Sequence, residues 1–138
     1  AFQLTNIIRD VREDLERDRI YIPLDEMSQF DVGVEDLATF KTTPNIVKLL
    51  TFQVERAKRY YQEAFALLAS ADRYRQRSGI IMAEIYQKTL TEIERDGYRV
   101  LENRIRLTPL HKFWIAWKIA RREKKMYKTD RLILQSTK

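Results

Sequence analysis

Apolar residues recur along this 138-residue chain every three or four positions, the spacing of helices with one buried side. The first such run extends from Phe2 to about Asp18. A second begins at Thr43-Pro44, where a capping hydroxyl precedes a proline in the first helical position, and should continue to about Ser70. Its predicted inward positions are Ile46, Leu49, Leu50, Val54, Ala57, Tyr61, Ala64, Phe65 and Leu68.

The remainder of the chain continues this helical pattern. No alternating strand pattern of useful length occurs, so the predicted fold class is all-α. Residues 19–29 are predicted to be a polar turn, because Pro23 opposes continuation of a helix, and residues 31–40 have room for a short helix. A third long helix is predicted from Ser78 to a stop at Gly97, and a last one from Thr108-Pro109 through Met126.

Composition limits the chemistry that these helices can carry. The chain has no cysteine and one histidine, His111, which excludes disulfides, thiolate metal sites and multi-histidine centres and opposes a Ser-His-Asp triad. Any metal must therefore be held by oxygen ligands, as Mg²⁺, Mn²⁺ or Ca²⁺ would be. The lack of cysteine fits a cytoplasmic protein, and no apolar run is long enough to cross a bilayer.

Positive charge is concentrated near the C-terminus. Residues 118–131 contribute five of the six net positive charges, and Trp114 and Trp117 precede them. Tryptophan beside basic residues is typical of a helix on an anionic membrane, so residues 114–131 are predicted to contact the inner face of the membrane peripherally. A solvated basic helix is the alternative. No recognised nucleic-acid-binding motif accompanies the charge, and no nucleic acid partner is expected.

One side of the first predicted helix carries a strip of polar side chains. Asn6, Asp10 and Asp14 follow one another about 6 Å apart along the helix axis, which suits oxygen ligands that each hold one position of a Mg²⁺ shell completed by water and diphosphate. A solvated acidic face with ion pairs is the alternative explanation of this spacing. At about 100° per residue the strip comprises Gln3, Asn6, Asp10, Asp14 and Arg17. The apolar residues of the helix occupy the adjacent sector, and Arg9, Arg12 and Glu16 are expected on the side opposite that sector.

The residues around this strip resemble a known signature. The run AFQLTNIIRDVRED at residues 1–14, with RIYIPL at residues 19–24, closely resembles the second aspartate-rich motif of the squalene/phytoene synthase family. The segments AEIY at residues 83–86 and GYRVLENRI at residues 97–105 are compatible with the C-terminal half of that family. The resemblance covers essentially the whole chain, with most of its specificity in residues 1–24.

The resemblance implies an all-α isoprenoid-synthase-type bundle around a central cavity, in which two aspartate-rich helices face each other across Mg²⁺, or Mn²⁺, and diphosphate. Residues 1–128 would form the C-terminal half of that domain, and residues 129–138 a basic tail. The implied catalytic residues are Asp10, Asp14 and Tyr86, the metal ligands Asn6, Asp10 and Asp14, and the substrate-binding residues Gln3, Asn6, Arg19, Tyr21 and Arg104.

The implied reaction joins two prenyl diphosphates head to head with Mg²⁺-assisted loss of diphosphate. The first expectation is that two farnesyl diphosphates give presqualene diphosphate or squalene in hopanoid or sterol-like lipid synthesis. The alternative is a phytoene synthase, which joins two geranylgeranyl diphosphates in carotenoid synthesis. An alternative of another class is a basic helical module without catalysis, bound to a membrane surface or to nucleic acid.

The first aspartate-rich motif of the family is missing from this chain. The chain is therefore interpreted as a fragment and is expected to be inactive by itself. Aromatic side chains are expected to line a dry cavity for the reacting prenyl groups, with ordinary core packing as the alternative for each. The candidates for that lining are Phe52, Tyr60, Phe65, Trp114 and Trp117.

Overall fold

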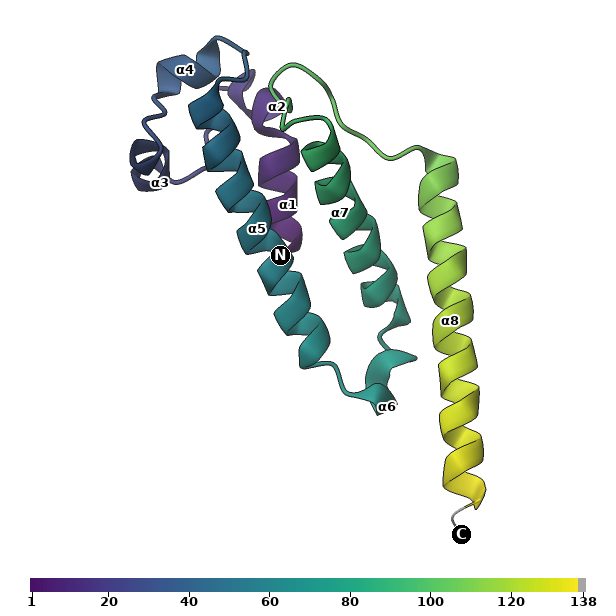
Figure 1. Cartoon of the computed structure of the whole chain (residues 1–138). Helices are drawn as coiled ribbons and strands as arrows, with labels where there is room; N and C mark the ends of the chain where they lie inside the picture. Colours follow the sequence, from purple (N-terminus) through teal and green to yellow (C-terminus); the bar gives the residue numbers. More distant parts are fainter. Residues whose placement is uncertain (137–138) are drawn as a thin grey trace.

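The computed structural model describes the backbone of residues 1–136 and the side chains of residues 1–129 and Leu132. The described residues form helices and no strand, which confirms the all-α class. In Figure 1, α1 lies between α5 and α7, and α8 lies beside α7 on the side away from α5. The helices are α1 (Phe2–Arg9), α2 (Val11–Leu15), α3 (Leu24–Gln29), α4 (Val34–Ala38), α5 (Pro44–Ala66), α6 (Ser70–Arg73), α7 (Arg77–Arg95) and α8 (Pro109–Ser136).

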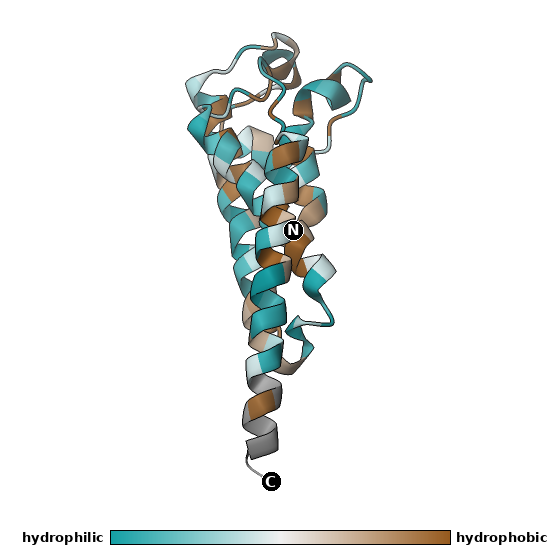
Figure 2. Cartoon of the chain, turned by 90° about the vertical axis from the view of Figure 1, so that its right-hand side faces the viewer, coloured by the Kyte–Doolittle hydropathy of each residue, from teal (hydrophilic) through white to brown (hydrophobic). Residues whose placement is uncertain are grey.

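The core lies where α1 packs into the groove between α5 and α7. Ile8 of α1 is fully buried there with Leu50 and Val54 of α5 and Leu90 of α7. Burial of each such side chain contributes about 1.5–3 kcal/mol. Hydrophobic and hydrophilic residues alternate along the ribbons, as expected of helices with one buried side (Figure 2).

The signals at Thr43-Pro44, Thr108-Pro109 and Gly97 act as predicted. The Thr43 hydroxyl accepts a hydrogen bond from the Ile46 amide at 3.3 Å, and Pro44 occupies the first helical position of α5. Thr108 caps α8 in the same way, through the His111 amide at 3.2 Å. Gly97 ends α7 with a φ of 71°, a conformation that glycine adopts at little cost.

The predicted boundaries differ from the structure in several places. α5 ends at Ala66 rather than about Ser70, and Ala64, predicted to point inward, is exposed. α7 begins at Arg77, so Ser78 is not its cap. α8 continues beyond Met126 to Ser136, and residues 137–138 of the predicted tail lie outside the described residues.

The first predicted helix is broken at Asp10, and two short helices were missed. Asp10 has a ψ of 14°, which separates α1 from α2, although the Asp14 amide still donates to the Asp10 carbonyl at 2.9 Å. α3 forms within the segment predicted to be a polar turn. It buries one side chain, Met27, and α6 buries none, so neither helix leaves an apolar repeat in the sequence.

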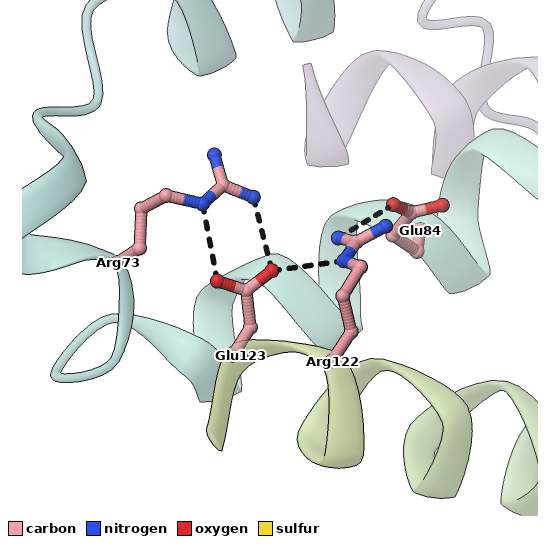
Figure 3. A network of polar contacts seen from close by, with 4 residues as sticks. All are labelled: Arg73, Glu84, Arg122 and Glu123. Carbon is pink, nitrogen blue, oxygen red and sulfur yellow. Dashed lines mark hydrogen bonds and ion pairs between the residues drawn. The ribbon is translucent and has the colours of Figure 1, made fainter. Parts of the chain in front are cut away.

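A buried ion pair fastens α8 to the bundle. Glu123 is 1% exposed, and its carboxylate accepts hydrogen bonds from Arg73 at 3.0 and 3.1 Å and from Arg122 at 3.0 Å. Arg122 also reaches Glu84 on α7 at 3.3 Å, so the network joins α6, α7 and α8 (Figure 3). Burial alone would raise the pKa of Glu123, but the two guanidinium groups hold it below its ordinary value.

Removing this charge should loosen α8. Glu123→Gln leaves Arg73 without its counter-ion and is expected to cost about 3 kcal/mol, the low end for buried pairs because both arginines reach solvent. Because the pKa of Glu123 is lower in the folded protein than in the unfolded chain, its ionised carboxylate contributes its full stabilisation above the unfolded pKa. That stabilisation is lost as the pH falls through the folded pKa. Urea unfolding should show the wild-type advantage at pH 7 and its decline below about pH 4. Glu55→Gln, at an exposed position of α5, should change stability little; an equal loss there would contradict this role.

Candidate functional site

The polar strip predicted on the first helix faces away from the core. Asp10 follows Ile8 by two residues, which at about 100° per residue places the two side chains on opposite sides of the helix. Ile8 points into the groove between α5 and α7, whereas Asp10 and Asp14 are half-buried and Gln3 is exposed. The packing of α1 therefore presents the strip on the outer side of this part of the fold.

Asp10 is held in place by its neighbour. Its two carboxylate oxygens accept hydrogen bonds from the Arg9 guanidinium at 2.7 and 2.5 Å. Arg9 was predicted on the opposite side of the helix, but its side chain is long enough to reach the carboxylate of the next residue. This pairing fixes the orientation of Asp10 and brings a cation to the strip, where an anionic group such as diphosphate would meet it.

Asp14 lies in a field of mixed charge. Its pKa is raised, first by burial and then by the negative charge of Asp10, while Arg17 and Arg19 act in the opposite direction. The two carboxylates are thus close enough to repel each other, and a cation between them would relieve that repulsion. Asp14 also lines a narrow crevice with Arg19 and Tyr21, so the structure brings these three predicted residues together.

Asn6 supplies a further oxygen one turn before Asp10. Its Oδ1 atom is buried and has no hydrogen-bond partner in the described part of the chain. An amide oxygen left in this state is costly unless something donates to it or binds it. The donor set of Asn6, Asp10 and Asp14 fits part of a Mg²⁺ or Mn²⁺ shell, because all three provide hard oxygen ligands.

The strip does not complete a metal site by itself. Among the described residues no cluster of three or more acidic, histidine or cysteine side chains is positioned to hold a metal ion. Glu92 and Asp96, which have the spacing of an aspartate-rich motif, are engaged elsewhere: Glu92 pairs with Lys88 and Arg95, and Asp96 pairs with Arg99. The remaining ligands would have to come from water, diphosphate or protein outside the described residues.

Tyr86 and Arg104 lie at different distances from this strip. The Tyr86 ring packs edge-on against Phe2 with 5.1 Å between ring centroids, and its hydroxyl interacts electrostatically with Arg9, the partner of Asp10. Arg104 lies 2.6 Å from Glu13 in an ion pair and is not in contact with Asp10 or Asp14. The structure therefore brings Tyr86 near the strip and holds Arg104 on the neighbouring residue of α2.

An apolar pocket opens beside the first turn of α1. It has a volume of about 480 Å³ and is walled chiefly by Phe2, Tyr60, Tyr61, Phe65 and Ile80. Tyr60 and Phe65 were predicted to line a cavity and do so. The other three candidates are elsewhere: Phe52 packs against Phe30, and Trp114 and Trp117 lie on the exposed face of α8.

Sequence reasoning missed the role of Arg12. Its guanidinium donates to the carbonyls of Leu101 and Glu102 at 3.1 and 3.2 Å and lies over the Phe40 ring at 5.3 Å. These contacts hold α2, and with it Asp14, against two segments distant in the sequence. The predicted solvent-side position gave no signal of this, since its partners lie 89 and 90 residues further along the chain.

Comparison with known proteins gives consistent matches for most of the chain. The family model described as squalene/phytoene synthase matches residues 1–111. Phytoene synthase from Arthrospira platensis is 38% identical over 75% of the chain and 34% of its own length, and that from Thermus thermophilus is 40% identical over 78% and 37%. Phytoene synthase 2 from Solanum lycopersicum is 38% identical over 71% and 32%. The chain thus spans about a third of the length of these relatives.

The partial burial of Asp14, together with the nearby negative charge of Asp10, predicts a stability difference. Asp14→Asn should stabilise the cation-free protein by up to about 1 kcal/mol, because it removes a carboxylate whose raised pKa marks it as unfavourable when ionised. Because the pKa of Asp14 is raised in the folded protein, the wild type gains stability as the pH falls through that pKa and the carboxylate is protonated. The stability difference between wild type and Asp14→Asn should therefore shrink in acid. Thermal unfolding in a chelator at pH 7 and pH 4 measures both effects. Asp18→Asn, at an exposed residue beyond α2, is the matched control; destabilisation by Asp14→Asn would contradict the assignment.

Proposed function

The chain belongs to the squalene/phytoene synthase family, and on that basis we propose that it provides one of two metal-binding helices of an enzyme that joins two prenyl diphosphates head to head. One observation carries this proposal: Asp10 and Asp14 repel each other on the outer side of α1–α2, next to the unpartnered Oδ1 atom of Asn6. On a solvated acidic face, side-chain amide oxygens would accept hydrogen bonds from water. Here the Oδ1 atom of Asn6 is instead buried without a hydrogen-bond partner among the described residues.

We propose that Asn6, Asp10 and Asp14 hold Mg²⁺, or Mn²⁺, against the diphosphate of the substrate. The bound metal would neutralise the charge that develops on diphosphate as the C–O bond breaks. Arg9 keeps Asp10 oriented, and Arg19 lies close enough to Asp14 to offset part of the rise in its pKa and, as proposed, to pair with the same diphosphate. Gln3, Tyr21 and Arg104 are proposed as further diphosphate contacts from the edges of the strip, and Tyr86 as a catalytic hydroxyl beside Arg9.

The apolar pocket is proposed to hold a prenyl chain. Loss of diphosphate leaves an allylic cation, which water would trap unless it is excluded. The walls formed by Phe2, Tyr61 and Phe65 offer aromatic faces that exclude water and interact favourably with positive charge. The pocket opens at the first turn of α1, the helix that carries Gln3 and Asn6, and we propose that the diphosphate end of a bound chain points toward these two residues.

Among the reactions of the family, we propose the phytoene synthase reaction on two geranylgeranyl diphosphates. The relatives named above are all phytoene synthases, which supports this alternative over the first expectation of farnesyl diphosphate and presqualene diphosphate. The chain spans about a third of their length, and its sequence resembles one of the two aspartate-rich motifs of the family. We therefore propose that activity requires a longer protein and that this chain alone turns over neither substrate.

Replacing Asp10 tests the proposed chemistry. In a longer protein that carries this chain and the remaining length of its relatives, Asp10→Asn should lower phytoene formation from geranylgeranyl diphosphate and Mg²⁺ about a hundredfold or more, because a metal ligand is lost. Product analysis by mass spectrometry measures this, with Asp18→Asn as a control that retains activity. Presqualene diphosphate formed from farnesyl diphosphate would restore the first expectation. Equal activity of Asp10→Asn and wild type would contradict the proposed site.

A further inference from the structure

The outer face of α8 combines exposed aromatic and basic side chains. Its inner face is fixed by Ile115, Ile119 and Glu123, which are spaced one turn apart and buried against the bundle. The residues on the other side of the helix are exposed. At about 100° per residue they form one continuous face, here called the α8 outer face: Leu110, Phe113, Trp114, Trp117, Lys118, Arg121, Lys124, Lys125 and Lys128.

The first two turns of this face are unusually apolar for a solvent-exposed surface. Leu110 is 83% exposed and Phe113 72%, and about half of each tryptophan is exposed. Contiguous apolar patches of this kind on an exposed surface mark sites of interaction. Tryptophan in particular favours the boundary between a polar and an apolar medium, because its ring is apolar and its indole N–H requires a hydrogen-bond acceptor.

The remainder of the face is cationic. None of its five basic side chains has an ion-pair partner among the described side chains, whereas Arg122, one position away, pairs with Glu84 and Glu123. Two of them lie over the tryptophans, with Lys118 5.0 Å from the Trp114 ring and Arg121 5.2 Å from the Trp117 ring. The acidic residue within this stretch, Glu123, points inward. The face is thus free of exposed carboxylate over about 27 Å of helix.

We propose that the α8 outer face docks on a bilayer surface containing anionic phospholipid. The helix would lie along the surface, with Leu110, Phe113 and the tryptophans at the level of the acyl chains and the basic side chains on the lipid phosphates. No described helix is long and apolar enough to cross a membrane.

Other occupants fit this face less well. A second copy of the chain would bring two rows of five cations together, which repel each other. Nucleic acid would satisfy the cations but would leave Leu110 and Phe113 facing water or phosphate. The face lies on the far side of α7 from α1, and all of it except Leu110 lies beyond residue 111, where the family match ends, so it is separate from the proposed reaction site (Figures 1 and 2).

The two tryptophans of the chain both lie on this face, so intrinsic tryptophan fluorescence reports on it directly. Vesicles of phosphatidylcholine and phosphatidylglycerol in equal amounts should shift the emission of the 138-residue protein to the blue and carry it into the pellet on sedimentation. Vesicles of phosphatidylcholine alone should do neither. Binding should weaken strongly at about 1 M salt, where the Debye length is about 3 Å.

Matched variants separate the face from the net charge. Lys124→Glu with Lys125→Glu should weaken vesicle binding roughly tenfold or more, since each lysine near an anionic surface contributes about fivefold in affinity and two are replaced. Lys41→Glu with Lys48→Glu removes the same charge from exposed positions outside the face and should change binding by less than about twofold. Trp114→Ser with Trp117→Ser should also reduce sedimentation, whereas Leu24→Ser, at another exposed apolar position, should not.

Each opposite result would overturn the proposal. If the protein bound neutral and anionic vesicles equally, the basic side chains would have no role in binding. If the Lys41 and Lys48 variant lost as much binding as the Lys124 and Lys125 variant, the effect would come from net charge alone. A blue shift that grows with protein concentration without lipid would show self-association. Tighter binding to random duplex DNA than to vesicles would assign the face to nucleic acid. Circular dichroism of every variant must match the wild type, which is expected because all the substituted side chains are exposed.

Discussion

The placement of α1 in the groove between α5 and α7 is the constraint on which the proposed chemistry depends. Thr5, Ile8 and Val11 are buried on one side of α1–α2, and the Thr5 hydroxyl lies 3.0 Å from the Tyr61 hydroxyl in a buried hydrogen bond. Because that side packs into the core, helical geometry places Asn6, Asp10 and Asp14 on the opposite side of the helix. The position of the carboxylates is thus determined by where the apolar side chains pack.

Much of the helical framework follows from local signals in the sequence. Thr43-Pro44, Thr108-Pro109 and Gly97 mark helix ends through interactions within four residues, so they act as they would in any helix. The strip was also predictable, because spacing along one helix fixes which residues share a side. Short helices such as α3 could not be predicted from the sequence. α3 buries a single side chain, and the surface against which that side chain packs belongs to other parts of the fold.

What the sequence could not provide was the long-range pairing around the strip. Arg12 was expected on the side of the helix opposite its apolar residues, and no role was predicted for Glu13. Both bind the segment after α7: Arg12 through the Leu101 and Glu102 carbonyls, and Glu13 through Arg104. The same limit applies to Glu123, whose burial depends on Arg73, a residue 50 positions earlier. These contacts couple α2 and α8 to the bundle.

The most direct test of the central claim is to locate a bound cation on the chain. Mn²⁺ added with inorganic diphosphate should broaden the backbone amide signals of residues 6–19 in an NMR spectrum of the protein, and Asp10→Asn with Asp14→Asn should abolish that selective broadening. Broadening centred on Glu92 and Asp96, or spread evenly over all exposed carboxylates, would show that the strip on α1–α2 is not the metal-binding surface.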